Sequence, residues 1–291
     1  MIRRKAKIEK TIAGYAFVLP ALLLIASFMI LPIFMTIYMS FFNKTLTKNV
    51  FVGFDNYVKL LSDIKFRTSL QHTFLYVLIL VTAVVFLSLY LSSVIVKKSE
   101  RAGSVYRALF YVPTIASAVT VSIIWNWVFN PVAGVANYIV RIFGAEPLMW
   151  FSDRKLAFMC VCIVAFVGLI GQPIILYTAA MNNISRDYYE AAALDGAGEW
   201  AKFTKITIPA VRPTTLYITI ITAINAFQIF IPIQLLTKGG PVNATTSIMY
   251  TLYTTAFTDN KFGYASAMGV VLLSVLTVFS VIQFKIQKST D

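Results

Sequence analysis

The chain has 291 residues, of which 58% are hydrophobic and only 13% are charged, with a formal net charge of +13. Soluble domains carry about 25% charged residues, so this composition excludes a soluble globular protein and places most of the chain in lipid. The basic residues lie between apolar blocks, a pattern typical of loops beside anionic membrane surfaces rather than of nucleic-acid-binding domains. We therefore expect an all-α membrane protein that binds no nucleic acid.

Six apolar stretches are long enough to cross a bilayer as helices. A short basic tail at 1–11 precedes the first stretch, which is too long for the apolar core of a signal peptide and is expected to be a retained span. Lysine and arginine number fifteen on the side of the two termini and ten on the other side, which predicts cytoplasmic termini. The predicted spans, within one transmembrane domain at 12–291, are 12–42, 70–96, 105–129, 156–181, 214–236 and 264–284.

The first loop on the outer side has apolar residues at helical spacing, namely Tyr57, Leu60, Leu61 and Ile64. Helical spacing of apolar residues in a polar segment is typical of helices that lie in the membrane interface. We therefore expect a short amphipathic helix on the membrane surface in this loop.

The interiors of the predicted spans contain no Asp, Glu, Lys or Arg. Proton relays, sodium-coupled sites and voltage sensors use such residues, so their absence argues against a proton-coupled transporter and a voltage-gated channel. The phosphate-binding pattern G-x-x-x-x-G-K-[S/T] is also absent, so uphill transport would need energy from another polypeptide. Cys160 and Cys162 cannot pair locally at a spacing of two on a helix, and we expect no metal site and no enzymatic centre.

Neutral polar side chains do occur within the spans, and an amide in contact with lipid is energetically costly. Such residues face either other helices, through hydrogen bonds, or a solute path. In the fifth span, amides alternate with aromatic rings, which favours a path for an uncharged, polyhydroxylated solute. Asn225 and Gln228 are three residues apart and are expected on one helical face. The candidate path residues are Asn225, Gln228, Phe227, Tyr177, Gln172 and Asn126.

A charged segment lies between the fourth and fifth spans, in the predicted cytoplasmic loop 182–213. Ser185 can cap a helix that begins at Arg186, and Gly196 is suited to the left-handed turn that ends a helix. A second short helix, EWAKFTKIT, is expected to end before Pro209.

The first of these two helices has the composition of a docking surface. The alanines at 191–193 are small and allow another protein to approach closely, while Glu190 and Asp195 supply charge at either end. This pattern favours a docking helix over a catalytic loop. The alternative is an interfacial helix that merely joins two spans.

The same segment resembles the cytoplasmic loop of bacterial ABC importer permeases, which has the pattern E-A-A-x3-G-x9-I-x-L-P. Ile208 replaces the leucine of the pattern, and the residues that match it are Glu190, Ala191, Ala192, Gly196, Ile206 and Pro209. The stretches GFDNYVKLL and YVPTIASAVTVSIIWNWVFNPVAGVANYIV are similar to the carbohydrate-uptake permeases of the maltose and multiple-sugar type. Within that group, WNWVFNP and TKGGPVNATT resemble the half related to the maltose F and lactose F subunits.

This resemblance implies the ABC importer permease fold, with six transmembrane helices and a cytoplasmic coupling helix, in a bacterial cytoplasmic membrane. It implies three kinds of protein partner: a second six-span permease, a dimer of ATP-binding cassette subunits and an extracytoplasmic sugar-binding protein. ATP-Mg would bind to the ATPase, so the chain itself is expected to hold no cofactor. The coupling residues implied are Glu190, Ala191, Ala192, Asp195, Gly196 and Ala197.

The expected function is therefore that of a permease subunit, not an enzyme, in an ATP-driven importer of a sugar, with a neutral oligosaccharide favoured. Two alternatives stay open. One is a permease of the glycerol-phosphate type, whose cationic site the partner permease would supply. The other is a self-sufficient channel or facilitator for small neutral solutes, which would account for the uncharged spans but not for the docking helix.

Overall fold

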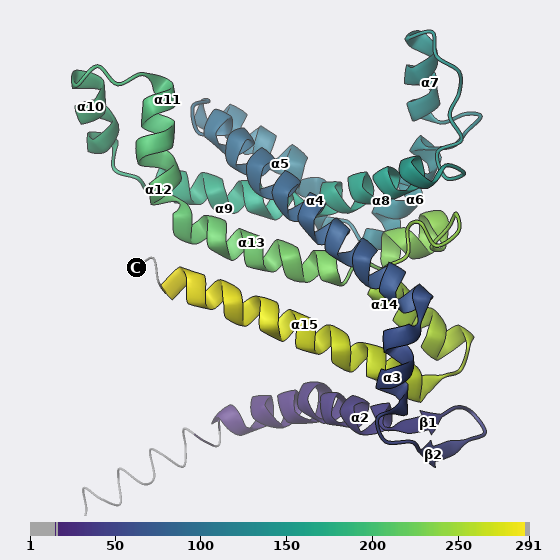
Figure 1. Cartoon of the computed structure of the whole chain (residues 1–291). Helices are drawn as coiled ribbons and strands as arrows, with labels where there is room; N and C mark the ends of the chain where they lie inside the picture. The colour runs from purple at the N-terminus through teal and green to yellow at the C-terminus, as the bar shows by residue number, and fades with distance from the viewer. Residues whose placement is uncertain (1–14, 16, 289–291) are drawn as a thin grey trace, which may run out of the picture. The chain divides into compact units, whose positions relative to one another are not determined.

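The structure of the chain is a computed structural model that describes residue 15 and residues 17–288 (Figure 1). The predicted tail at 1–11 and the first residues of the first span lie outside the described residues. Among the described residues, nearly all regular structure is helical and the only sheet is one short hairpin, which confirms the predicted all-α class. The contacts define two compact units, drawn from Met1–Ser62 with Leu252–Leu273 and from Asp63–Thr251 with Ser274–Asp291.

By length and apolar composition, three single helices of the described residues could cross a membrane, and the number of candidate spans rises to six if each bent pair of helices is one span. The single helices are Phe17–Ser40, Ile64–Ile95 and Phe262–Gln283. The other three spans each consist of two helices joined at a bend, namely Glu100–Ile115 with Ala118–Val128, Arg154–Leu169 with Gly171–Asn182, and Glu199–Ala210 with Arg212–Phe227. The predicted number of spans is therefore reached only when each bent pair counts as one span.

The first unit combines apolar helix with a small hairpin. Asn56 joins the two, because its side-chain amide donates to the carbonyl oxygens of Ser40 at 2.7 Å and Phe42 at 3.0 Å. The strands are antiparallel, and Phe42 lies opposite Phe51. The elements are η1 (Ala26–Ile30), α2 (Leu31–Ser40), β1 (Phe42–Lys44), β2 (Asn49–Phe51), α3 (Asp55–Ser62) and η4 (Thr254–Thr258), where η denotes a π-helical segment.

The predicted amphipathic helix of the first loop is α3. Of the predicted apolar set, Leu60 is buried, whereas Leu61 is exposed. Ile64, however, is exposed and belongs to the next helix, because Asp63 begins that helix by accepting two backbone N–H groups of its first turn. The amphipathic helix therefore ends at Ser62, two residues before the last residue of the apolar pattern.

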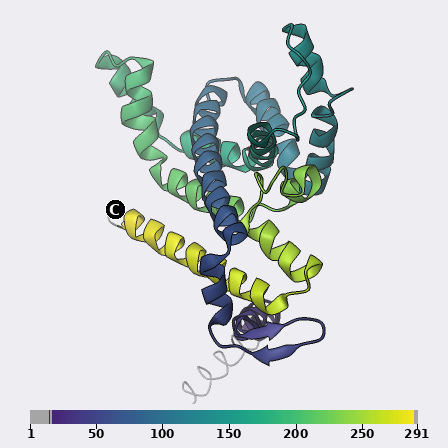
Figure 2. The same cartoon turned by 45° about the vertical axis from the view of Figure 1, so that its right-hand side comes forward.

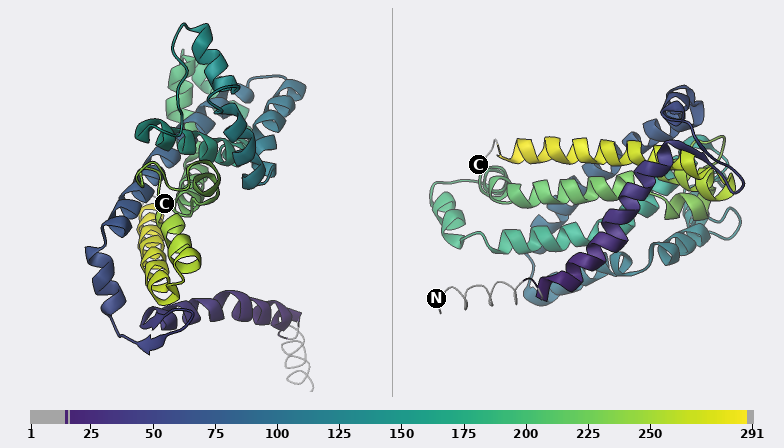
Figure 3. Two further views of the ribbon diagram at one scale, coloured as in Figure 1. Left: turned by 90° about the vertical axis from the view of Figure 1, so that its right-hand side faces the viewer. Right: turned by 90° about the horizontal axis from the view of Figure 1, so that it is seen from below.

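The second unit is organised around α4, which packs against α13, α9 and α8. Helices α9 and α13 lie side by side (Figures 1 and 3). Helices α10 and α11 stand at one end of this unit, and α7 lies at the opposite end (Figures 1 and 2). The elements are α4 (Ile64–Ile95), α5 (Glu100–Ile115), α6 (Ala118–Val128), α7 (Val135–Ile142), α8 (Arg154–Leu169), α9 (Gly171–Asn182), α10 (Arg186–Leu194), α11 (Glu199–Lys202), η2 (Phe203–Thr207), α12 (Ile208–Ala210), α13 (Arg212–Phe227) and η3 (Ile233–Thr237), with α14 (Ile248–Tyr253) and α15 (Phe262–Lys288) each shared between the units.

Proline explains where the spans bend, because it lacks an N–H group and its ring clashes with the preceding turn. Pro113 lies inside α5, and the chain turns by 100° between α5 and α6. Pro173 lies in the first turn of α9, which meets α8 at 44°. The stretch 214–236, predicted as one span, is not one helix, because α13 ends at Phe227 and helix resumes only beside Pro232.

The core of the second unit is apolar, but hydroxyl groups fix the long loop that follows η3. The Tyr76 hydroxyl donates to the carbonyl oxygen of Thr245 at 3.0 Å, and the backbone N–H of Ile248 donates to Thr73 Oγ1 at 2.9 Å. Both contacts join this loop to α4. A buried cluster between α4, α9 and α13 comprises Val84, Tyr177, Met181, Val211 and Ile218.

Candidate functional site

Helix α10 has a defined cap at each end, as predicted. The Ser185 hydroxyl accepts the backbone N–H of Asp187 at 3.2 Å. At the other end Gly196 has φ of +75°, and its N–H donates to the carbonyl oxygen of Ala193 at 3.0 Å. The N–H of Ala197 donates to the carbonyl oxygen of Ala192 at 2.8 Å. This pair of bonds closes the helix in the manner of a Schellman motif, whose left-handed position favours glycine at 196.

Helix α10 has no buried residue, and all of its side chains are exposed except those of Tyr189 and Ala192, which are half-buried. Leu194 is 90% exposed, and Tyr188 is exposed on the same helix. Glu190 and Asp195 are exposed as well. Large apolar side chains that stand clear of the fold beside charged groups are typical of a protein interaction surface.

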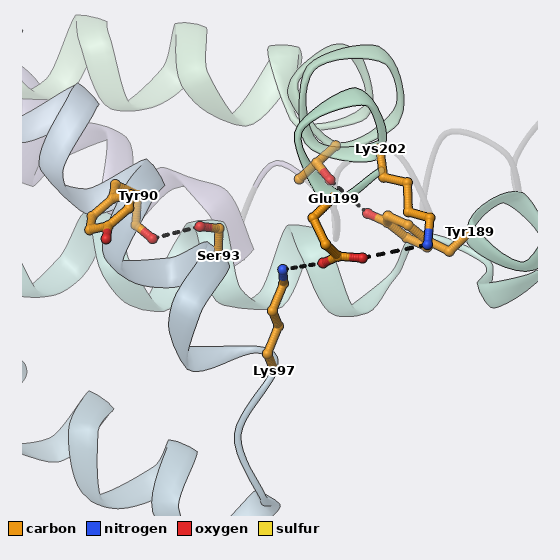
Figure 4. Close-up of polar contacts among 7 residues, drawn as sticks. Tyr90, Ser93, Lys97, Tyr189, Glu199 and Lys202 are labelled. Atoms are coloured by element: carbon orange, nitrogen blue, oxygen red, sulfur yellow. Dashed lines mark hydrogen bonds and ion pairs between the residues drawn. The ribbon is translucent and has the colours of Figure 1, made fainter. Parts of the chain in front are cut away.

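Two contacts tie α10 and α11 to the rest of the second unit (Figure 4). The Tyr189 hydroxyl of α10 forms a hydrogen bond with Thr207 Oγ1 at 2.9 Å. Glu199 of α11 forms an ion pair with Lys97, just beyond the end of α4, and a second with Lys202 at 3.4 Å. Glu199 lies in the charged segment outside the predicted spans, and the Lys97 ammonium, followed by that of Lys202, holds the pKa of its carboxyl below the usual value. The charged segment is thus held by one contact from α10 and one from α11.

The second helix of the charged segment differs from the prediction. It does not end before Pro209, because α11 continues through η2 into α12, which contains Pro209. Proline is tolerated in the first turn of a helix, where its missing N–H group has no helical acceptor. The chain instead turns at Val211, between α12 and α13.

Two adjoining cavities lie at the middle of the second unit, one of about 310 Å³ and one of about 160 Å³. They share part of their lining, namely Thr114, Gly168, Leu169 and Asn225. These residues come from α5, α8 and α13, so the cavities form where the bent helices meet. The lining of both cavities contains no ionisable acid or base other than the phenol of Tyr217.

The structure brings together half of the candidate path residues. Asn225 lines both cavities, Gln228 lines the larger one and Gln172 the smaller one. Gln228 follows the last residue of α13, so the two amides reach the cavity from a helix end rather than from one helical face.

The other three candidates lie elsewhere. Phe227 is buried against the rings of Phe74 and Phe279, with centroids 5.5 and 5.6 Å away. Tyr177 is fully buried in the cluster between α4, α9 and α13. Asn126 is exposed on α6, outside the lining of the two cavities.

Thr114 and Gly171 are two site residues that the sequence reasoning missed. Thr114 Oγ1 is buried without a hydrogen-bond partner among the described residues, and Thr114 lines both cavities. A Cβ atom at Gly171 would overlap with Thr114 and with the backbone of Phe110. The only local signal for this close approach is Pro113 inside an apolar stretch, which indicates a bend but not its partner. Among the described residues, no three His, Cys, Asp or Glu side chains are grouped as metal ligands.

Several transport permeases are similar in sequence to most of this chain. The lactose transport system permease protein LacF of Rhizobium radiobacter is 31% identical, over 93% of this chain and 92% of that protein. The multiple sugar-binding transport system permease protein MsmF of Streptococcus mutans is 31% identical, over 96% of each chain. The diacetylchitobiose uptake system permease protein NgcF of Streptomyces coelicolor is 32% identical, over 82% of this chain and 71% of that protein.

The fold is that of a membrane permease from an ABC importer. A crystallised bacterial ABC transporter involved in import of the acidic polysaccharide alginate contains a chain that matches with a TM-score of 0.88 and 22% identity, over 99% of both chains. Residues 84–291 match the family described as binding-protein-dependent transport system inner membrane component, and the chain belongs to this family. It is a transport subunit and not an enzyme. The predicted resemblance to carbohydrate-uptake importer permeases is confirmed.

Proposed function

We propose that this chain is one half of the membrane pore of an ATP-driven importer that carries a neutral oligosaccharide into the cell. A second six-span permease would form the other half, and an extracytoplasmic binding protein would deliver the sugar. A dimer of ATP-binding subunits would bind ATP-Mg and supply the energy, with no cofactor in this chain. The names of the relatives support a sugar as solute, since they refer to lactose, multiple sugars and diacetylchitobiose.

The exposed and doubly capped helix α10 is the observation that carries the proposed coupling to an ATPase. Its caps hold the alanines at 191–193 in a fixed helix, and small exposed side chains allow a partner's backbone to come close. Leu194, at 90% exposure, would be the apolar anchor in the partner's surface. Tyr189 contacts Thr207 of η2, which leads through α12 into α13, and Glu199 pairs with Lys97 just beyond α4, so a push on α10 would be passed toward both helices.

The proposed solute follows from the lining of the two cavities. Asn225, Gln228 and Gln172 present amides that both donate and accept hydrogen bonds, as sugar hydroxyls require. Thr114 adds a buried hydroxyl without a partner in the described part of the chain. A phosphorylated solute would be expected to recruit arginine or lysine, and neither lines these cavities. This lining supports a neutral sugar over a glycerol-phosphate-type solute.

The proposed orientation places α10 and both chain termini in the cytoplasm. The excess of lysine and arginine on the predicted inner loops supports this orientation. The loop after α4 and the α10 segment, both predicted on the inner side, meet through Lys97 and Glu199. Helix α7, from a predicted outer loop, lies at the opposite end of the second unit (Figure 1).

Co-purification of the full-length chain with its partners tests the proposal. Ala191→Trp enlarges an exposed position of α10, so it should leave the fold intact and abolish capture of the ATPase. Ala145→Trp enlarges an exposed position in the loop after α7 and should leave capture unchanged. Equal capture by both variants would contradict docking at α10. Sugar uptake by proteoliposomes that contain this chain alone would instead support a self-sufficient facilitator.

A further inference from the structure

A third cavity, of about 700 Å³, lies between the end of α4 and the segment that contains α10 and α11. Figure 4 shows part of its lining: Tyr90 and Ser93 from α4, Lys97 from the turn after it, and Glu199 and Lys202 from α11. All of these residues belong to the second unit. The cavity shares no lining residue with the two that contain Asn225, and the proposed sugar path does not pass through it.

The ionisable lining of this cavity has an excess of positive charge. Three lysines, Lys97, Lys98 and Lys202, face a single carboxylate, Glu199. Lys97 and Lys202 both pair with Glu199, whereas the Lys98 side chain has no ion pair or hydrogen bond among the described residues. The Lys202 side chain is only 19% exposed, so its ammonium is held at the wall of the cavity. The arrangement leaves one lysine free and two sharing one acid, which is suited to an added anion.

Apart from the hydroxyls of Ser93 and Thr207, the rest of the lining is apolar or aromatic, which favours an anion that carries an apolar part. Val94 and Phe203 are apolar, and Tyr90 and Trp200 add aromatic rings, of which Trp200 is 75% exposed. The cavity opens where the apolar helix α4 ends and the lysines begin, at the level where aromatic rings and basic side chains meet lipid headgroups. A free inorganic anion would satisfy the lysines but would leave the apolar walls in contact with water.

We propose that this cavity binds the headgroup of an anionic phospholipid. The phosphate would lie between Lys98 and Lys202, and the first methylene groups of the acyl chains would cover Val94 and Phe203. Basic pockets at the cytoplasmic ends of membrane helices bind such headgroups, so the site belongs to the inner leaflet in the proposed orientation. A bound lipid would connect the end of α4 to α11 and stiffen the support of the docking helix.

Native mass spectrometry of the full-length chain, released from detergent micelles, tests this site. The probes are phosphatidylglycerol and phosphatidylcholine with the same acyl chains, and inorganic phosphate alone. Wild-type protein should retain phosphatidylglycerol in preference to phosphatidylcholine. Lys98→Gln should weaken its apparent affinity about fivefold, the typical contribution of one lysine near an anionic headgroup. Lys155→Gln, an exposed lysine at the start of α8, should change nothing.

A variant that is expected to bind the lipid more tightly distinguishes a loss of the binding site from a general loss of fold. Glu199→Gln releases Lys97 and Lys202 from their carboxylate and should tighten the binding of phosphatidylglycerol, which a misfolded protein cannot do. Equal retention of the two lipids, equal effects of Lys98→Gln and Lys155→Gln, or weaker binding by Glu199→Gln would overturn the proposal. Displacement of the lipid by inorganic phosphate alone would identify a free anion as the ligand and would also overturn it.

Discussion

Two glycines, one in each functional region, are needed for opposite physical reasons. Gly196, after α10, has φ of +75°, and a Cβ atom added there would meet nothing within 4 Å. Gly171, at the start of α9, would place a Cβ atom onto Thr114 and the backbone of Phe110. The turn after α10 therefore depends on the conformation of its own backbone, whereas the cavity region depends on how closely α5 and α9 approach. The first requirement is local and the second is not.

The largest expected effect is at Gly171. Gly171→Ala should force α5 and α9 apart, because the overlap is with backbone that cannot rotate away. Overpacking of this kind costs about 1–3 kcal/mol of unfolding free energy, and uptake should fall because Thr114 and both cavities shift. Thermal unfolding of the purified chain measures the loss. Gly168→Ala, on the neighbouring helix α8 with nothing within 4 Å, is the control and should unfold at or above the wild-type temperature. A melting temperature of Gly171→Ala equal to that of the wild-type protein would contradict the close approach of α5 and α9.

Gly196→Val should have a moderate effect that is confined to coupling. A β-branched residue in the left-handed region costs roughly 1–3 kcal/mol, so the turn after α10 should distort while the spans stay intact. Sugar-stimulated ATP hydrolysis by the assembled transporter should fall, with normal membrane insertion. Gly196→Asn should restore most of it, since asparagine tolerates this conformation. Gly198→Ala, at φ of −70° in open space, should be silent. Full activity of Gly196→Val would show that the left-handed turn is dispensable.

Asn225→Leu tests whether the two cavities contact the solute. The side chain faces both cavities, so its replacement should leave stability unchanged and remove a hydrogen bond to the solute. A bond worth about 0.5–1.5 kcal/mol corresponds to a two- to tenfold rise in the KM of uptake. Thr219→Ala, on the same helix, removes a hydroxyl that donates to the carbonyl oxygen of Thr215 at 2.8 Å and lines neither cavity, and its KM should be normal. Equal KM values for all three proteins would exclude Asn225 from the path.

The smallest expected effect is at the exposed ion pair between Lys97 and Glu199. Surface pairs contribute little and are screened by salt, so Lys97→Glu should lower the melting temperature slightly in low salt and not in high salt. The double reversal Lys97→Glu with Glu199→Lys should recover the loss. Because Lys97 and Lys202 lower the pKa of Glu199, the pair's contribution is full above the usual pKa of 4.5 and is lost as pH falls through the lowered value. A loss that persists in high salt would point to packing instead.

The capped helix α10 could be predicted from the sequence because its determinants are neighbours along the chain. Ser185, the alanines and Gly196 specify a capped helix within a dozen residues, and the apolar stretches mark spans by length alone. The end of the second helix could not be predicted from Pro209, because a proline can follow the end of a helix or lie in its first turn. The structure shows that Pro209 lies within α12 and that the chain turns at Val211.

The sequence was sufficient to predict the class of protein, six apolar stretches whose interiors carry no charge, and the capped helix α10. Tertiary structure alone decided which polar residues reach a cavity. Asn225 and Phe227 are two residues apart, yet one faces the cavities and the other is packed between Phe74 and Phe279. Hydropathy cannot separate these outcomes, because lipid and the interior of a helix bundle are equally apolar. The same limit hid Thr114, whose role arises only where Gly171 lets two bent helices meet.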